Sequence, residues 1–449
     1  MGFMGLMGLI SPEAKAQNGF NVPFSQFGIG LSEQPFNLPM VTRMGGVAYT
    51  LSANNYVNPF NPASYGAIEP ESFVFDMGVD VQLTTLRDNS HDPIHDADGN
   101  LGYLLMAMPL TKWWKLSAGL MPYSTVDYES VKLQEGDPTY GGGTVKTVYS
   151  GTGGVNQVYL GMAFNVLRSR APQTGEGKWW RPDVQVGFNA NYLTGNVQRS
   201  IAYAFMGNDS TYFINSSRYK KTTVSNLTFD FGLLVRQPLN DKTSLELGVV
   251  YKPYFDMQVN DMALIYTYVG STLLDTIFPA PGDDPEFKSR LERPQTLGIG
   301  LSLTLDQRWR VAADATFAAW GGMKYTEGQT PSILGNSSLR FDNYSHYAVG
   351  VERTGSMDAS TYWGRISWSL GAHLTSGVLS LDLGNSTQRL AEKGVGAGAT
   401  LPMRKGRSLL TLSMGYSSLG SPDILQRNVV TFGIAVSSCE RWFAKRKYN

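Results

Sequence analysis

Residues 296–305 read Thr-Leu-Gly-Ile-Gly-Leu-Ser-Leu-Thr-Leu, and in this stretch large aliphatic residues alternate strictly with small or hydroxylated ones. A period of two is that of a β-strand, whose successive side chains point to opposite faces. One face of such a strand is uniformly apolar, the other is small and polar, and about ten residues are enough for a tilted strand to cross a membrane. The stretch therefore predicts one strand of a transmembrane β-barrel.

The same alternation recurs along the chain and gives about fourteen strand candidates, an even number as in bacterial outer-membrane barrels. The first candidate carries Phe73, Phe75 and Met77 on one face and Asp76 and Asp80 on the other. The others lie at roughly 100–109, 113–125, 152–166, 183–204, 224–237, 243–257, 294–305, 308–320, 343–353, 361–377, 393–402, 408–417 and 428–438. We therefore predict an all-β fold, a 14-stranded antiparallel transmembrane β-barrel over residues 71–438.

Composition agrees with a barrel and argues against several other classes. The mean hydropathy of -0.18 and the absence of a long apolar run exclude a helical membrane protein, while aromatic residues make up 12% of the chain. The 37 basic and 37 acidic residues balance, which gives no electrostatic case for nucleic-acid binding. The single cysteine, Cys439, has no partner for an intrachain disulfide.

The connections between the strand candidates alternate between long and short, as expected of a barrel with long loops outside and short turns in the periplasm. The long ones include 86–99, 126–151 and 258–293. Residues 167–182 depart from this rule, because they would form an unusually long periplasmic turn.

The N-terminal part of the chain lacks sustained alternation. Residues 1–16 resemble a secretory signal peptide that ends in a small-x-small site, so the mature chain would begin near Gln17. Residues 17–70 are rich in Gly, Asn and Pro and also carry many aromatic side chains, which would be unlikely to stay exposed to water. We expect this segment to fill the barrel lumen as a plug, or hatch, and residues 439–449 to form a periplasmic C-terminal tail.

Four stretches resemble the FadL-like family of outer-membrane proteins, the OmpP1/FadL/TodX-type hydrocarbon transporters, in the version common in Bacteroidota. They are a segment with Phe27-Gly28-Ile29-Gly30, Met44-Gly45-Gly46 and Asn61-Pro62-Ala63-Ser64, the strand from Pro294 through Gly298 and Gly300, the strand from Trp309 through Asp314 to Trp320, and the pair Trp442-Phe443. The resemblance implies a plugged barrel in the outer membrane of a Gram-negative bacterium, surrounded by lipid and lipopolysaccharide. It also implies passive uptake of hydrophobic small molecules, such as a long-chain fatty acid or a hydrocarbon, without a cofactor.

Two other functions remain open at this point. Some relatives resemble subunits of outer-membrane machines, including the barrel-assembly and type IX secretion complexes, so the chain is alternatively a non-transporting barrel in a complex with other outer-membrane proteins. Catalysis has no support, because the sequence contains neither a nucleophile elbow nor a metal-ligand spacing, and we expect no enzyme.

Charged residues on the small-residue faces would point into the lumen, where they must be paired or hydrated. These candidates for a polar network in the lumen are Asp76, Asp80, Asp230, Arg310, Asp314 and Arg365. One hypothesis is that the carboxylates, Asp314 foremost, hydrogen-bond the plug near Arg43 or its glycine backbone and so hold the hatch. The alternative is a network within the wall that joins Arg310, Asp314 and Arg365 without touching the plug.

Further candidates lie in the plug and in the first long loop. Gly45 and Gly46 suit a close approach of the backbone better than phosphate binding, because no strand and helix frame them. Asn61-Pro62-Ala63 is either a hinge or seal of the hatch or an ordinary turn into the barrel. In the loop, a weak calcium candidate comprises Asp92, Asp96 and Asp98, and the alternative is a solvated polar loop.

Overall fold

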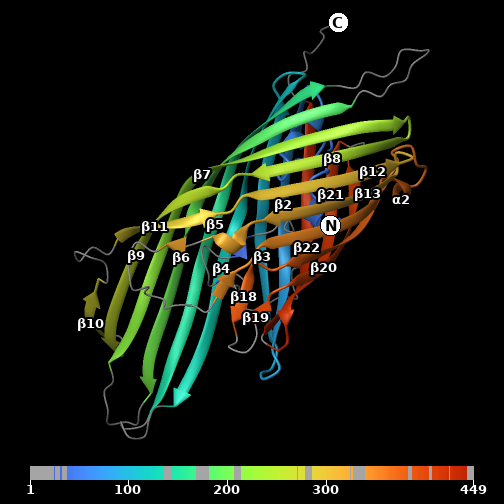
Figure 1. Cartoon of the computed structure of the whole chain (residues 1–449). Coiled ribbons are helices and arrows are strands. Elements are labelled where there is room, and N and C mark those ends of the chain that lie inside the picture. Colours follow the sequence, from blue (N-terminus) through green and yellow to red (C-terminus); the bar gives the residue numbers. More distant parts are fainter. Residues whose placement is uncertain are drawn as a thin grey trace, which may run out of the picture.

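The structure is a computed structural model, and it describes residues 25, 31–32, 38–135, 143–167, 182–206, 214–270, 272–278, 286–323, 325–326, 339–382, 387–403, 407–423 and 425–441. The expected signal peptide, the link at 168–181, the Phe27–Gly30 stretch and the tail from Trp442 lie outside these residues. The first and last strands pair along their length, from Ser72 with Arg441 to Arg87 with Gln426, and close a ring (Figure 1).

The ring is a closed, 14-stranded antiparallel β-barrel, which confirms the predicted strand number. In ring order its strands are β2 (Ser72–Arg87), β3 (Ile94–Pro109), β4 (Trp114–Glu135), β5 (Thr144–Leu167), β6 (Asp183–Met206), β7 (Asn215–Asn240), β8 (Thr243–Lys252), β12 (Thr296–Leu305), β13 (Trp309–Ala318), β16 (Tyr344–Arg353), β17 (Ser367–Ser376), β20 (Glu392–Met403), β21 (Ser408–Ser421) and β22 (Leu425–Arg441). The barrel thus ends at Arg441 and not at 438, because β22 stays paired with β2 beyond Ser438.

The two faces of the wall differ as the alternation predicts. On β12, Leu297, Ile299 and Leu301 are exposed on the outside, whereas Gly298 and Gly300 face inward and are buried. The outer face therefore offers an apolar surface to lipid, and the inner face is small and polar. None of the helices among the described residues is long and apolar enough to cross a membrane.

One end of the barrel, here called the turn end, carries short connections such as Asp241-Lys242 between β7 and β8. At the opposite loop end, β4 to β7 continue well beyond the shorter strands (Figure 1). Three more strands, β9 (Phe255–Val269), β10 (Thr272–Ile277) and β11 (Glu286–Arg293), join the loop-end halves of β4 to β7 there. We call this part the loop-end extension.

The expectation of a long loop at 258–293 is wrong, because β9, β10 and β11 lie there. The expected loops at 86–99 and 126–151 are also largely strand. The alternation in the loop-end extension is inverted: on β9, Met257 and Val259 face inward and are buried, while Gln258 and Asn260 are exposed. Such a pattern suits a sheet whose outside faces water, and the membrane pattern used for the prediction excludes it. Pro253 marks the change, because it interrupts the strand between β8 and β9.

The remaining elements are short. A small sheet contains β15 (Leu339–Phe341), β18 (Leu379–Asp382) and β19 (Thr387–Arg389). The other short elements are β14 (Tyr325–Thr326), which pairs with β11, α2 (Tyr362–Arg365) and η5 (Trp320–Gly322).

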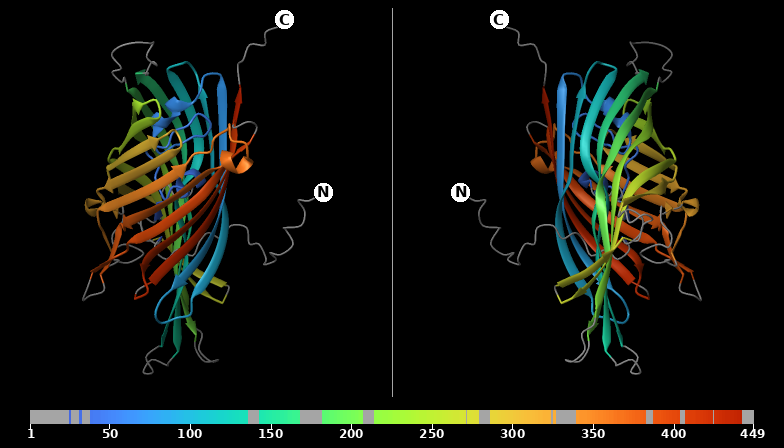
Figure 2. Two further views of the ribbon diagram at one scale, coloured as in Figure 1. Left: turned by 90° about the vertical axis from the view of Figure 1, so that its right-hand side faces the viewer. Right: turned by 90° about the vertical axis from the view of Figure 1, so that its left-hand side faces the viewer.

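The N-terminal elements lie within the ring of strands, where Figure 2 shows them in blue. They are β1 (Leu31–Ser32), α1 (Pro39–Thr42) and the 3-10 helix η3 (Pro62–Ala67). We call Leu38–Ile68 the lumenal segment. Most of its side chains are buried, and its apolar residues form one core cluster with inward residues of the wall such as Leu105 and Tyr159.

Candidate functional site

The lumenal segment touches the wall through backbone that only glycine can approach. A Cβ added at Gly350 would lie 2.6 Å from the Met44 carbonyl oxygen, and one added at Gly187 would lie 2.5 Å from the Pro62 carbonyl. The same close approach by the segment holds at Gly232, Gly248, Gly298, Gly371, Gly396 and Gly398. The small residues of the inner face therefore provide the space in which the segment lies.

Gly45 and Gly46 end the short helix α1 by turning the chain into a left-handed conformation. Their φ angles are +67° and +102°, which L side chains rarely adopt. The Gly46 N–H donates to the Val41 carbonyl at 3.1 Å, a hydrogen bond typical of helix C-termini. A Cβ at Gly45 would also overlap the backbone of Gly371 and Ala372, so both the turn and the contact with β17 require glycine.

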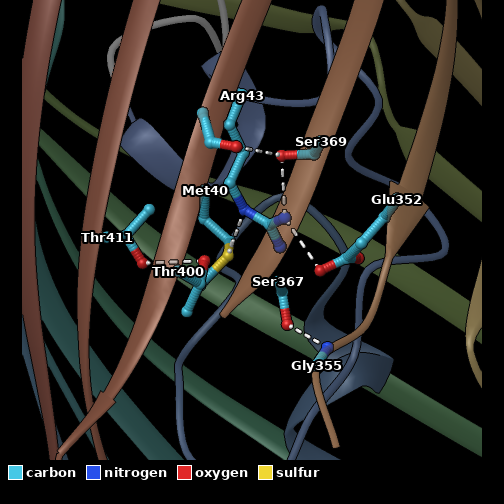
Figure 3. Close-up of polar contacts among 9 residues, drawn as sticks. Met40, Arg43, Glu352, Gly355, Ser367, Ser369, Thr400 and Thr411 are labelled. Carbon is cyan, nitrogen blue, oxygen red and sulfur yellow. Dashed lines mark hydrogen bonds and ion pairs between the residues drawn. The ribbon is translucent and has the colours of Figure 1, made fainter. Parts of the chain in front are cut away.

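Arg43 joins α1 to the wall by an ion pair (Figure 3). Its Nη1 lies 2.8 Å from Glu352 Oε1 on β16 and donates to Ser369 Oγ on β17 at 3.0 Å. Its Nε lies 3.1 Å from Met40 Sδ, which holds the guanidinium against its own helix. Both charges are buried, so each depends on the other for compensation.

Asp314 on β13 binds the backbone of the lumenal segment directly. Its Oδ2 accepts the N–H of Ala48 at 2.6 Å and that of Tyr49 at 2.8 Å. The Tyr49 hydroxyl lies 2.8 Å from Thr316 Oγ1 on the same strand. One carboxylate therefore satisfies two buried N–H groups for which the irregular segment has no secondary-structure partner.

The two Asn-Pro pairs organise the second half of the segment. Asn61 caps η3 by accepting the Ala63 N–H at 3.1 Å, and its amide donates to the Tyr49 carbonyl at 2.7 Å and to the Leu233 carbonyl of β7 at 3.3 Å. The Asn58 amide donates to two carbonyls of the segment, those of Ala48 and Leu51. Asn61-Pro62-Ala63 thus lies against the wall as a buried helix start, well before the first barrel strand.

The other acidic candidates of the lumen also have partners. Asp76 Oδ2 accepts the Val57 N–H at 3.3 Å, so it is a further contact with the lumenal segment, and Asp80 Oδ2 accepts the Gln82 amide at 3.1 Å. Asp230 pairs with Arg293 at 2.9 Å.

Arg310 lies 3.9 Å from Glu246 on the neighbouring part of the wall, whereas Asp314 binds the lumenal segment and Arg365 binds the Ala359 carbonyl. Arg293, the partner of Asp230, is not among the residues predicted from the sequence, because it precedes Pro294 in a stretch expected to be a loop.

Two expectations need correction. Arg365 does not point into the lumen: it ends α2, is exposed, and donates to the Ala359 carbonyl. The regular alternation begins only at Ser367, so the parity count does not reach Arg365.

The calcium candidate is the second case. Asp96 and Asp98 belong to β3 and accept backbone N–H groups of the same strand, while Asp92 precedes it. Among the described residues, no three or more His, Cys, Asp or Glu side chains gather as a metal ion requires.

The wall itself is split between β3 and β4. These strands pair only near the turn end, from Leu104 with Leu120 to Pro109 with Lys115. We call the unpaired stretch, between residues 94–103 of β3 and 121–135 of β4, the seam. Pro122 has no N–H to donate, and the strand bulges between Pro122 and Ser124, which explains why the pairing stops there.

A cavity of about 740 Å³ lies at the seam. Its apolar lining includes Leu104, Leu120, Met121, Val126 and Val155. Val155 also belongs to the apolar cluster inside the loop-end extension, which includes residues of β6, β7, β9 and β11. The seam therefore leads from the outer surface to an apolar interior, and three carboxylates line it as well: Asp80, Asp98 and Asp127.

Comparison with known proteins assigns the family. The model of the BamG family matches residues 3–449, nearly the whole chain. The chain belongs to the BamG family. No functionally curated protein matches the sequence of this BamG-family chain.

Solved structures show the same fold at low sequence identity. The CymD monoaromatic hydrocarbon channel is 13% identical with a TM-score of 0.51, and the match covers 90% of this chain and 98% of that one. A Pseudomonas aeruginosa FadL homologue is 13% identical with a TM-score of 0.52 over 89% and 97%. The resemblance seen in the sequence thus holds for the fold, whereas the matching family model is BamG.

Proposed function

We propose that this chain lies in the outer membrane of a Gram-negative bacterium, that the lumenal segment plugs its barrel, and that the cavity at the seam takes up hydrophobic small molecules. The outward apolar residues of β12 and its neighbours would face lipid and lipopolysaccharide. The inverted pattern on β9 supports a loop-end extension that lies in water, and in this proposal it lies outside the cell. The short turns, including Asp241-Lys242, would then lie in the periplasm.

The observation that carries this proposal is the cavity at an unpaired part of the wall. An apolar molecule that reaches the seam from outside or from the bilayer meets Leu104, Leu120 and Met121 before any part of the lumenal segment. A mainly apolar cavity with a few polar groups is the usual form of a small-molecule site. The structural neighbours include the CymD monoaromatic hydrocarbon channel and the Pseudomonas putida toluene transporter TodX, which suggests the class of cargo to test.

Passage to the periplasm requires that the lumenal segment rearrange, because it fills the lumen beside the wall. Its polar links to the wall are separate side-chain contacts, among them the Arg43–Glu352 ion pair, the Asp314 carboxylate and the Asn61 amide. Each can break without unfolding a strand. We infer a plug that shifts locally as a molecule passes down its concentration gradient, so no energy source is needed.

A cavity-blocking variant tests the proposal. Gly99 lines the cavity, and a Cβ added there meets only ordinary contacts, the nearest 3.7 Å away. Gly99→Phe should therefore fold and place its ring beside Val81, on the outer side of the cavity, where it obstructs the entrance. It should lower uptake of radiolabelled toluene or oleate into proteoliposomes at least about tenfold. Gly322→Phe is the matched control, because nothing lies within 4 Å of a Cβ at Gly322. Equal uptake by the two variants would count against the seam as the entry site.

The proposal includes export with cleavage of residues 1–16, which leaves residues 17–70 as the plug-forming part of the mature protein and residues after 441 as a periplasmic tail. N-terminal sequencing of protein from outer-membrane fractions should begin at Gln17. A chain that retains Met1 in the cytosolic fraction would contradict export.

A second candidate function is that of a non-transporting subunit of an outer-membrane complex, as in barrel-assembly or type IX secretion machinery. Membership of the BamG family favours it. The loop-end extension also favours it, because β5 and β6 each have 24 residues and would be roughly 80 Å long, far more than the apolar band of about 25 Å. The surplus strand length offers a large surface to partners.

Co-purification separates the two candidates. The tagged chain is isolated in mild detergent, and both its co-eluting proteins and its bound lipids are identified by mass spectrometry. A stoichiometric outer-membrane protein, retained by the Gly99→Phe variant, would support the subunit role. A hydrophobic molecule that is lost in this variant would support uptake.

A further inference from the structure

The seam exposes two edges of the β-sheet. β3 is paired with β2 on one side, and β4 is paired with β5 on the other, from Trp114 to Glu135. Within the described residues, no strand of the ring pairs across the seam beyond Leu104 and Leu120. The backbone N–H and C=O groups that alternate along such edges are ready to pair with an added strand.

The chain itself shows that the β4 edge accepts an extended segment. β1 pairs with it in antiparallel register, Leu31 with Thr125 and Ser32 with Ser124. Further along the same edge, the Asp127 N–H donates to Ser25 Oγ at 3.2 Å. Among the described residues, the N-terminal contacts with this edge reach Asp127, whereas β4 continues to Glu135. From Glu129 onward the side chains of β4 are exposed.

The charge of the seam indicates what kind of strand would fit. Residues 94–102 and 121–135 carry five carboxylates and one lysine: Asp96, Asp98, Asp127, Glu129, Glu135 and Lys132. Asp127 on β4 is within electrostatic range of Asp96 and Asp98 on β3. Like charges that face each other oppose direct pairing of β3 with β4, and lysine or arginine between them would relieve the repulsion.

A second cavity, of about 510 Å³, lies in the same region. Asp96, Asp127 and Glu129 line it together with one cation, Arg199, and with neutral residues such as Ser150 and Gln198. Three carboxylates and one guanidinium therefore border this part of the β4 edge, and the balance is acidic. This second cavity lies toward the loop end, next to the cavity lined by Leu104 and Leu120.

We propose that the seam binds an extended, basic segment of a partner protein, which pairs as an additional antiparallel strand with the β4 edge beyond Asp127 and places its cationic side chains beside Asp96, Asp98, Asp127 and Glu129. The backbone supplies affinity, and the carboxylates supply selectivity for positive charge. This inference goes beyond uptake of small molecules. The experiment below measures peptide binding and not uptake. Strand addition can therefore fail while uptake is confirmed, and uptake can fail while strand addition is confirmed.

The test uses the full chain in non-ionic detergent and three labelled ten-residue peptides. The first alternates lysine and valine, the second replaces lysine by glutamate, and the third is the lysine peptide with N-methyl groups on one edge, which remove its backbone donors. We expect fluorescence anisotropy to show binding of the first peptide, and at least about tenfold weaker binding of the other two. Equal binding of the lysine peptide and its N-methylated form would overturn strand addition, and equal binding of the glutamate peptide would overturn charge selection.

A matched pair of variants locates the site. Asp98→Asn/Asp127→Asn should weaken binding of the lysine peptide at least about tenfold. Asp241→Asn/Asp306→Asn removes the same charge at the turn end and should leave it unchanged. Equal effects of the two would assign the attraction to overall charge and overturn the proposal.

Hydrogen exchange of the unmodified chain does not depend on how these variants fold. The lysine peptide should protect residues 128–135 of β4 and leave β21 unchanged. Protection of 128–135 that rises with protein concentration without peptide would assign the edge to a second copy, and displacement of the lysine peptide by toluene would assign it to a hydrophobic molecule. Either result would overturn the proposal.

Discussion

The Asp314 carboxylate allows a graded test of how firmly the lumenal segment is held. Asp314→Ala removes the carboxylate that accepts two buried N–H groups, those of Ala48 and Tyr49, which lie 2.6 and 2.8 Å from Oδ2. A buried donor without a partner costs about 1–3 kcal/mol, so two of them cost roughly 2–6 kcal/mol. The barrel strands keep their own hydrogen bonds, and this cost should therefore fall on the segment.

The assay is hydrogen exchange of the segment, read by mass spectrometry on peptides that span Ala48 and Tyr49. Each 1.4 kcal/mol changes an equilibrium about tenfold, so opening of this part should become roughly 30- to 20,000-fold more frequent in Asp314→Ala. Asp314→Asn keeps a neutral acceptor, and because charged acceptors bind about twice as strongly, we expect about half of the free-energy change.

The control is Asp241→Ala, which removes an exposed carboxylate at the turn end. It should leave exchange at Ala48 and Tyr49 unchanged. Unchanged exchange in Asp314→Ala itself would show that Asp314 does not hold the segment. A uniform increase across β12 and β13 would show instead that it stabilises the wall.

Three further predictions concern other parts of the molecule. Arg43→Ala leaves a buried glutamate on β16 without its cation, which should cost about 3–5 kcal/mol and lower the temperature at which the folded band disappears in unboiled gel samples, with partial rescue by Arg43→Lys. Gly371→Ala places a methyl group against the backbone of the lumenal segment and should destabilise by at least about 1–3 kcal/mol in the same assay, whereas Gly322→Ala, in open space, should be neutral. In the turn after β2, the hydrogen bond from His91 and backbone N–H groups hold the pKa of Asp88 below its usual value. The carboxylate thus stabilises this turn above its unfolded pKa and loses that effect as the pH falls through the lowered pKa. Carboxyl carbon NMR should therefore show a titration midpoint that rises in His91→Ala.

The strands that cross the membrane were predictable because both of their faces are constrained. On β12, lipid requires apolar residues outside, and the side chains of Tyr49 and Asp314 leave no room for a Cβ at Gly298 and Gly300 inside, so large aliphatic residues alternate strictly with small ones. In the loop-end extension the exposed residues are polar and the inside is an apolar cluster, which inverts the pattern. A search for strands with apolar residues on the outer face assigns such residues to a loop. The inversion of the pattern at Pro253 is nevertheless visible in the sequence itself.

The contacts of the lumen were only partly predictable. Parity places Asp314 inside, because its neighbours in sequence, Ala313 and Ala315, are apolar and lie on the other face. It cannot say that Asp314 meets the Ala48 and Tyr49 backbone, since an irregular segment has no period from which its position follows. Arg365 shows the converse, because a short helix breaks the count before it reaches this residue.

The prolines at 253 and 294 separate the membrane part of the wall from its loop-end extension at matching heights, since Lys252 pairs with Thr296 just below them. A two-residue turn from Lys252 to Thr296 would convert β8 and β12 into an ordinary hairpin and leave the ring closed. The stretch from Pro253 to Pro294 therefore acts as an insertion between β8 and β12. It can lengthen, shorten or change its surface without altering the number of strands in the barrel. Evolution can thus revise what this protein presents to the outside while the lipid-facing cylinder and its contents stay as they are.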